Sequence, residues 1–342
     1  FAVSCEGCGL EFGTRGLRGI LAQPANLLRP SRLKAAAQLV RFYREARALR
    51  AGDEGAETTL GEFLEHGRYS EEFRRHGIVP LISSVWSTPA SMVSDFPARY
   101  LFDFMANHGI LSLDGRRAWR TVVGGSTSYI DRLVDALPNR VRTGTPAKAV
   151  WREDQDVIIE SNVGIERFDA VVLATHADQS LHLLADPTRA EREALSSIKY
   201  SASKAVLHLD TSVMARRRAA WGSWNYRTAR CTLEPEPLSV TYHLNRLQQF
   251  GATRDYFVTM NPRRELKPGS VIQELSLAHP VYSKDTLSGQ RMIRALNGLN
   301  RTFYAGAYMG YGFHEDGYRS GLEVAGMIGE EVPRLVNAES GS

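Results

Sequence analysis

The sequence predicts an α/β protein with two domains, and three observations support this prediction. Of its 342 residues, 43% are hydrophobic and 23% are charged, which provides enough apolar material for two cores. Continuous apolar runs at 169–175 and 302–305 are typical of buried parallel strands. Helical spacing of apolar residues predicts helices at 30–49, 285–296 and 316–328. Alternation of such strands and helices is typical of α/β architectures.

The first part of the chain is predicted to be a short hairpin followed by helices. Residues 1–12 form an alternating pattern around two glycines. Thr59 and Glu62 have the spacing of a capping box, so a second helix is expected to begin there after the one at 30–49. The stretch 78–108 is rich in aromatic and small apolar residues, and it either packs a helical core or lines an apolar cavity.

The middle of the chain is predicted to pass from a strand and a glycine turn at 122–126 into a helix. That helix is expected to bury an apolar face made of Tyr129, Ile130, Leu133, Val134 and Leu137. A small β-meander is expected from short strands at 140–142, 147–151, 157–161 and 165–168. An antiparallel or mixed sheet is expected from strands at 205–209, 238–244, 256–260 and 271–277.

Residues 302–317 carry the most specific pattern in the sequence. An apolar strand stops at Gly306, and the glycines from there to Gly317 let the backbone approach a flat ligand without Cβ atoms in the way. The helix that opens near Asp316 presents N–H groups and the positive end of its dipole to an electron-rich atom. A glycine-rich loop that joins a strand to a helix without a ligand gives the same pattern.

Residues 302–326 resemble the C-terminal flavin-binding segment of the flavin amine oxidase superfamily, which includes monoamine oxidases, protoporphyrinogen oxidases and carotenoid desaturases. In that family an Ala-Gly pair ends the strand, and a later acidic residue and glycine begin a helix whose backbone N–H groups face the flavin. The resemblance implies FAD as the cofactor, with contacts from Gly306, Ala307, His314, Glu315, Asp316 and Gly317. Ala307 or Tyr308 stands where the family often has an acidic residue for the sugar chain.

Three earlier stretches resemble the same family in the same order. Gly124 and Gly125 match a glycine pair before the helix that leads to the adenine-binding strand, and Ala147 matches the start of that strand. Ala174 and Thr175 end a strand that lies beside the cofactor in the family. The resemblance therefore adds these residues to the expected FAD contacts.

The resemblance implies a Rossmann-like FAD/NAD(P)-binding domain interleaved with an α+β substrate domain. The FAD-binding parts are expected at 121–200 and 284–342, and the substrate-binding parts at 1–120 and 201–283. The family begins with a strand, a G-x-G-x-x-G turn and a helix that hold the pyrophosphate. No such glycine pattern follows a strand in this sequence, which starts at Phe1 inside an apolar run. The first βαβ unit is therefore expected to be missing, as in a chain truncated at its N-terminus.

One candidate catalytic residue follows from the same resemblance, and two follow from aromatic side chains in the sequence. A flavin accepts a hydride from a substrate carbon, so the protein mainly orients the substrate and shapes an apolar cavity. Lys204 resembles in position a lysine with which the family holds a water near the flavin, although a surface lysine at a strand gives the same pattern. Trp224 and Tyr311 are interpreted as aromatic walls for an apolar or cationic substrate, with core packing as the alternative.

Three functions remain open from the sequence. The first is an FAD-dependent oxidoreductase of the amine oxidase type, which transfers a hydride from an apolar or amine substrate to the flavin. The second is a flavin-dependent desaturase or isomerase of lipid-like substrates, which the apolar stretch 78–108 favours. The third is a noncatalytic remnant or binding module, because the phosphate-binding turn does not occur in the sequence.

The composition argues against several other classes. The net charge is +4, acidic and basic residues are mixed along the chain, and the arginine run 216–218 is interpreted as a surface turn rather than a nucleic-acid patch. No stretch approaches the roughly 20 apolar residues of a membrane span, and no signal-peptide pattern occurs. A cytoplasmic protein without a transmembrane span is therefore expected, with contact to a membrane surface left open.

The three cysteines are too few for a disulfide framework. The run Cys5-Glu6-Gly7-Cys8 has the spacing of half a zinc site or of a redox pair, but no second C-x-x-C and no histidine pair lies near it in the sequence. The two residues are therefore interpreted as incidental thiols in a hairpin turn, and no metal is predicted.

Overall fold

The computed structural model describes residues 1–52, 57–111, 120–137, 141–231 and 238–339. The chain divides into two compact units, each built from two segments. Unit 1 comprises Phe1–Ser128 and Ser201–His279, and unit 2 comprises Tyr129–Tyr200 and Pro280–Ser342. Both helices and sheets occur along the chain, which confirms the mixed α/β class. The functions assigned to the two halves of the chain stay predictions.

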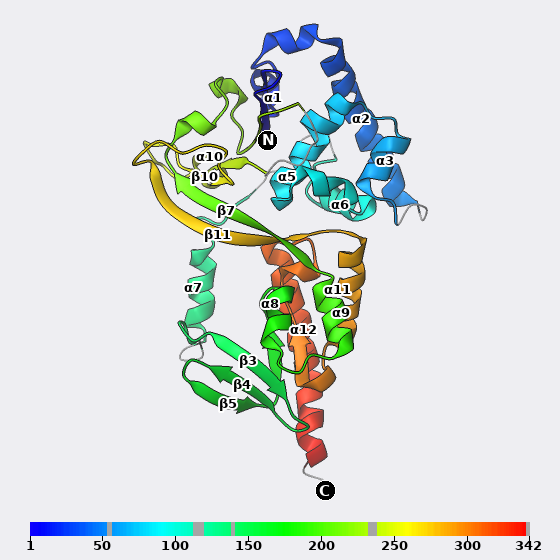
Figure 1. The fold of residues 1–342 in the computed structure, drawn as a ribbon, viewed down its shortest axis with the longest axis vertical. Helices are drawn as coiled ribbons and strands as arrows, with labels where there is room; N and C mark the ends of the chain where they lie inside the picture. Colours follow the sequence, from blue (N-terminus) through cyan, green and yellow to red (C-terminus); the bar gives the residue numbers. More distant parts are fainter. Residues whose placement is uncertain (53–56, 112–119, 138–140, 232–237, 340–342) are drawn as a thin grey trace. The chain divides into compact units, whose positions relative to one another are not determined.

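Unit 1 is built on a mixed sheet. Its strands are β1 (Ala2–Cys5), β2 (Leu10–Gly13), β7 (Lys199–His208), β8 (Trp224–Thr228), β9 (Val240–His243), β10 (Phe257–Met260) and β11 (Val271–Val281). In the described residues they follow the order β11-β7-β10-β9-β8-β1-β2, with the long β7 and β11 at one side (Figure 1). β1 and β2 form the predicted antiparallel hairpin, and β1 also pairs in parallel with β8, a strand that was not predicted.

The helices of unit 1 enclose an aromatic core. The α-helices are α1 (Gly16–Ile20), α2 (Pro30–Ala51), α3 (Leu60–His66), α4 (Glu71–Phe73), α5 (Val79–Trp86), α6 (Ala98–Asn107) and α10 (Leu244–Gln248). Shorter 3₁₀ turns are η1 (Pro24–Leu28), η3 (Ala90–Asp95), η4 (Thr211–Val213) and η5 (Arg218–Ala220), and η2 (Arg74–Ile78) is a π-helix. The buried ring of Phe42 lies 5.4 Å from that of Phe102 and 5.6 Å from that of Phe73. These aromatic contacts hold α2, α4 and α6 together.

The predicted capping box before α3 is confirmed. The Thr59 hydroxyl accepts the N–H of Glu62 at 3.2 Å, and the Glu62 carboxylate accepts the N–H of Thr59 at 2.7 Å. Within the stretch 78–108, the rings of Phe102 and Phe104 are buried, so its aromatic residues serve mainly as core.

The region around 122–126 differs from the prediction. Its described residues form a turn and no strand, and helix α7 (Thr127–Asp135) follows directly. The apolar face of α7 is exposed in the described part of the chain, with Ile130 at 46% and Leu133 at 56% exposure. The prediction of a buried face is therefore wrong, because periodicity identifies an apolar face but not what covers it.

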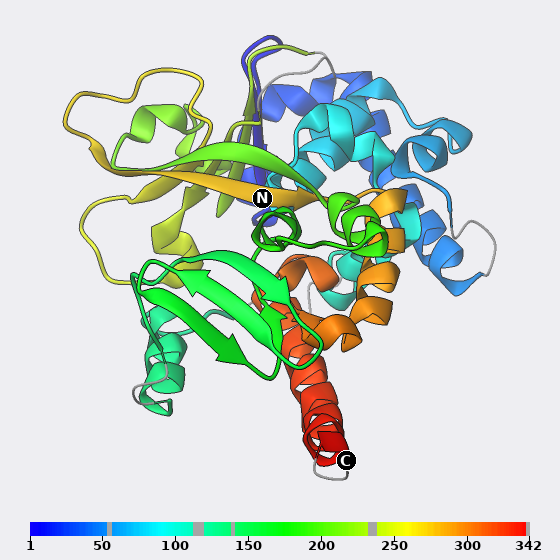
Figure 2. The ribbon, with the colours of Figure 1, turned by 60° about the horizontal axis from the view of Figure 1, so that its bottom comes forward.

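Unit 2 combines a parallel strand pair, a β-meander and helices. The parallel pair is β6 (Val171–Leu173) and β12 (Thr302–Tyr304). The meander is β3 (Ala147–Arg152), β4 (Val157–Ser161) and β5 (Gly164–Phe168), whose strands lie side by side in Figure 2. The helices are α8 (Ala177–Leu183), α9 (Arg189–Ser196), α11 (Lys284–Leu296) and α12 (His314–Glu339), with the 3₁₀ turns η6 (Leu299–Arg301) and η7 (Ala307–Met309). The predicted meander, parallel strands and C-terminal helices are confirmed. The predicted strand 140–142 is wrong at Val141 and Arg142, and residue 140 lies outside the described residues.

A buried ion pair links three elements of unit 2. Arg152 on β3 donates to Glu191 on α9 at 2.8 Å, and the Tyr304 hydroxyl on β12 donates to the same carboxylate at 2.6 Å. Burial alone would raise the pKa of Glu191, but the hydrogen bonds from Arg152 and Tyr304 outweigh it and lower the pKa to about 2. The glutamate is therefore an anion fixed inside the core of unit 2.

Candidate functional site

The carboxyl ends of β6 and β12 bring together four of the predicted cofactor-binding residues. The two strands are parallel, with Leu173 paired to Tyr304, and the N–H of Ala305 donates to the Leu173 oxygen at 3.2 Å. Ala174 and Thr175 therefore leave β6 at the same edge at which Gly306 and Ala307 leave β12. In open α/β sheets this edge is where ligands bind.

The glycine loop between β12 and α12 is partly filled by its own side chains. A Cβ atom on Gly306 would lie 2.6 Å from the ring of Tyr308, so the open space predicted beside Gly306 is occupied on that side. Gly312 has a φ of 92°, and a Cβ there would lie 2.7 Å from the Tyr282 hydroxyl. At Gly317 the nearest atom to an added Cβ is the Ala307 nitrogen, at 3.6 Å. The loop is thus more open at Gly317 than at Gly306.

The first turn of α12 is capped by its own residues. The N–H groups of Asp316 and Gly317 both donate to the Phe313 oxygen at 3.1 Å, and the Asp316 carboxylate accepts the Phe313 N–H at 3.0 Å. His314 and Glu315 are exposed at the beginning of the helix. His314 Nδ1 lies 2.6 Å from the Tyr129 hydroxyl of α7.

The other predicted cofactor contacts lie on separate elements. Ala147 is exposed at the beginning of β3 in unit 2. Gly124 and Gly125 belong to unit 1, where both have a φ of 83° in the turn before α7. The assignment of these residues to FAD stays a prediction.

A cavity of about 1350 Å³ lies within unit 1. This volume exceeds the roughly 300–1,000 Å³ of common small-molecule sites. Side chains from the β1–β2 hairpin, α2, α4, η2 and α10 contribute to its walls, including Leu10, Phe12, Leu39, Tyr43, Phe73 and Leu247. The cavity is therefore formed by segments far apart in the sequence, and only two residues of 78–108 line it: Ile78 and Leu81.

The candidate catalytic residues have different surroundings. Trp224 lines the cavity, as expected of an aromatic wall. Lys204 lies within β7 rather than at its start, and its exposed ammonium pairs with Glu274 at 2.9 Å. Tyr311 is partly buried in the loop before α12 and belongs to unit 2. The catalytic roles of all three stay predictions.

Positive charges in the cavity wall were not anticipated from the sequence. Arg32, Arg120 and Arg246 line it together with the acidic Glu72, which lies 3.6 Å from Arg32. Burial, followed by repulsion from Arg15 and Arg218, lowers the pKa of Arg246, although a guanidinium keeps its proton in proteins. No local pattern marks these arginines, because the wall exists only after folding.

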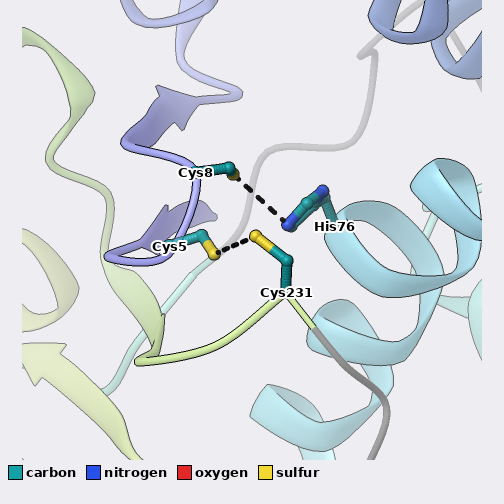
Figure 3. Close-up of side chains that lie close together, drawn as sticks. All are labelled: Cys5, Cys8, His76 and Cys231. Carbon is teal, nitrogen blue, oxygen red and sulfur yellow. Dashed lines mark hydrogen bonds between the residues drawn. The ribbon is translucent and has the colours of Figure 1, made fainter.

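The interpretation of Cys5 and Cys8 as incidental thiols stays a prediction, but their surroundings in the structure were not anticipated from the sequence. Cys231 and His76 lie beside them, so four side chains with metal-ligand chemistry face one another (Figure 3). Only the C-x-x-C spacing signalled this cluster in the sequence.

No helix in the described part of the chain is both long and apolar enough to cross a membrane.

Comparison with known proteins identifies the fold. No family profile matches the chain, and no curated protein matches it. It is similar to a CLA-producing fatty acid isomerase from P. acnes, with 17% identity and a TM-score of 0.61 over 94% of this chain and 78% of that chain. A protein assigned as a protoporphyrinogen oxidase from Exiguobacterium sp. 255-15 has 16% identity and a TM-score of 0.61, over 96% of this chain and 80% of that one. A putrescine oxidase bound to putrescine has 12% identity and a TM-score of 0.61, over 96% and 81%. These likenesses show that the chain shares the fold of these three proteins.

Proposed function

We propose that this protein is an FAD-dependent oxidoreductase that acts on a long apolar substrate carrying an anionic group. The observation that carries the proposal is the 1350 Å³ cavity of unit 1, which combines apolar walls with three arginines. The fold supports the flavin part of the proposal, and the cavity supports the substrate class.

The residues at the edge of β6 and β12 fit one part of FAD. Ala174 and Gly317 provide main chain with little side-chain bulk, next to the positive end of the α12 dipole. In the described residues β6 pairs with β12 alone, so its other edge is where a further parallel strand bearing a G-x-G-x-x-G turn would add. When bound, FAD supplies a two-electron acceptor for a hydride, while this chain orients the ring and excludes water.

Replacing Gly317 tests the flavin site. Gly317→Leu is expected to abolish the visible flavin absorbance of the full-length protein, because the side chain occupies the space beside Ala307. Gly326→Leu is the matched control: it lies on the same helix with nothing within 4 Å of an added Cβ, and it is expected to bind FAD normally. Full flavin binding by the Gly317 variant, or none by wild type supplied with FAD, would contradict the proposal.

The electrostatics of the cavity favour a carboxylate over an ammonium. Arg120 and Arg246 raise the local positive potential, which attracts an anionic group and repels a cationic one, whereas the charge of Arg32 is offset by Glu72 at 3.6 Å. The carbonyl of Trp221 accepts from the Arg246 guanidinium, which limits its movement. An amine substrate is the second candidate, favoured by aromatic rings that line the cavity at Tyr43, Trp224 and Phe250.

Ligand binding distinguishes the two candidates. Oleate is expected to displace a fluorescent fatty acid from the protein, and dodecylamine is expected to compete more weakly. Arg246→Met should weaken oleate binding about tenfold or more, because a charge-assisted hydrogen bond contributes roughly 1.5–3 kcal/mol. Ala36→Trp fills the cavity and should block binding, whereas Ala37→Trp lies exposed on α2 outside the cavity and should not. Tighter binding of the amine would favour the second candidate instead.

A further inference from the structure

Four side chains from three separate segments of unit 1 converge at one point. Cys5 and Cys8 come from the β1–β2 hairpin, His76 comes from the π-helix η2, and Cys231 follows β8. Their ligand atoms all lie within 4.8 Å of one another. Figure 3 shows Cys8 and His76 pointing toward each other, and Cys5 pointing toward Cys231.

We propose that Cys5, Cys8, His76 and Cys231 bind a zinc ion in a tetrahedral structural site. Three thiolates and one imidazole are a common ligand set for structural zinc. With bonds of about 2.3 Å to sulfur and 2.0 Å to nitrogen, tetrahedral zinc holds its ligand atoms roughly 3.5–3.8 Å apart. The Sγ atoms of Cys5 and Cys231 lie 3.3 Å apart, and Cys8 Sγ lies 3.9 Å from His76 Nε2. Shifts of a few tenths of an ångström bring these two pairs to the spacing of a tetrahedron.

The local sequence is suited to this convergence. Gly7 lies between the two hairpin cysteines, and a Cβ there would lie 3.2 Å from the Cys231 nitrogen and 3.3 Å from its sulfur. Gly9, directly after Cys8, has a φ of 66°, a left-handed conformation that favours glycine. A side chain at either position would disturb the turn or the approach of Cys231.

The surroundings complete the site. His76 presents Nε2 to the cysteines, and its Nδ1 lies 3.2 Å from Glu72 Oε1. Zinc-bound histidines commonly donate this second ring N–H to a carboxylate, and a reorientation of the Glu72 carboxylate would be needed to form that hydrogen bond. Zinc with three thiolates and a neutral imidazole carries one net negative charge. The Arg32 guanidinium lies 3.9 Å from Cys8 Sγ, where it offsets that charge. Four protein ligands leave no open position, so the ion joins the hairpin, η2 and the segment after β8 rather than binding substrate.

A disulfide is the competing chemistry for these thiols. Cys5 and Cys231 are free in the structure, with sulfurs farther apart than the roughly 2.05 Å of a covalent bond. A disulfide between them would also leave Cys8 and His76 facing each other without a shared partner. Zinc instead uses all four side chains.

Metal analysis of the full-length protein tests the proposal. Protein from zinc-supplemented medium is expected to contain about one zinc per chain, with an X-ray absorption spectrum fitted by three sulfurs and one nitrogen. Cys8→Ser and His76→Gln should lower zinc content at least about tenfold under competition with a chelator. His66→Gln is the control, because His66 is exposed on α3 and outside the cluster.

Wild-type measurements keep the proposal testable if these variants fail to fold. Replacement of zinc by cobalt should produce the intense visible absorption of tetrahedral cobalt with thiolate ligands. Alkylation under denaturing conditions with a chelator should modify all three cysteines. The proposal is overturned if reduced wild-type protein takes up neither zinc nor cobalt, or if Cys5 and Cys231 are recovered as a disulfide from protein kept under reducing conditions.

Discussion

Replacing Glu191 by glutamine is expected to destabilise unit 2 by about 3 kcal/mol at pH 7. The Glu191 carboxylate accepts hydrogen bonds from Arg152 at 2.8 Å and from Tyr304 at 2.6 Å. Folding lowers its pKa from 4.5 to about 2, and each pKa unit corresponds to ~1.36 kcal/mol. The variant loses this charge-dependent stabilisation and leaves the buried Arg152 without its main counter-ion.

The pH dependence gives a second measurement of the same quantity. A carboxyl group whose pKa is lowered by folding stabilises the protein fully above its unfolded pKa, here 4.5, and loses this effect as the pH falls toward the folded pKa of about 2. Between pH 7 and pH 3.5, wild type should therefore lose roughly 1–2 kcal/mol more than Glu191→Gln. Urea unfolding followed by circular dichroism at both pH values measures this difference.

The prediction for Glu191→Gln has a matched control variant and a result that would contradict it. Glu193→Gln changes an exposed carboxylate on the same helix and should alter the free energy of unfolding by less than about 0.5 kcal/mol. If Glu191→Gln costs less than about 1 kcal/mol and keeps the wild-type pH dependence, the network does not stabilise unit 2 as argued. The double variant of Glu191→Gln with Arg152→Met gives a further test. If Glu191 stabilises unit 2 by pairing with Arg152, removing Arg152 as well restores part of the free energy of unfolding that Glu191→Gln loses; if it does not, the double variant restores none.

Two further predictions concern local structure, and thermal unfolding checks both. Thr59→Ala removes the hydroxyl that caps α3 and should cost about 1 kcal/mol, whereas Thr59→Ser should keep most of the stability; equal melting temperatures for the two variants would contradict the role of the cap. Gly312→Ala places a Cβ in a left-handed conformation 2.7 Å from the Tyr282 hydroxyl and should cost roughly 1–3 kcal/mol. Gly321→Ala, with open space around its Cβ on α12, should be neutral or stabilising, and a loss at Gly321 equal to that at Gly312 would refute the strain argument.

The elements that the sequence predicted correctly depend on residues that are only a few positions apart in the sequence. The capping box needs only Thr59 and Glu62, and the meander needs only alternation over five or six residues per strand with turns between them. The glycine-rich loop after β12 was identifiable for the same reason. Short-range preferences of this kind are encoded within one turn of helix or one pair of strands.

The features that the sequence did not reveal depend on contacts between distant segments. Cys231 is 226 positions from Cys5, and His76 is 68 positions from Cys8, so no spacing rule connects them. Arg32 on α2 and Arg246 on α10 line the same cavity only once the chain has folded. The expectation that α7 buries its apolar face was wrong for the same reason. An apolar stripe such as that of Ile130 and Leu133 does not determine which segment packs against it.

The parallel pairing of β1 with β8 sets the order in which the chain can fold. Ala2 pairs with Asn225, and the segment Tyr129–Tyr200 of unit 2 lies between them in the sequence. During synthesis the ribosome must release that whole insertion before β1 can meet its parallel neighbour. The sheet of unit 1 is thus completed late, and non-local pairing of this kind is expected to slow its assembly.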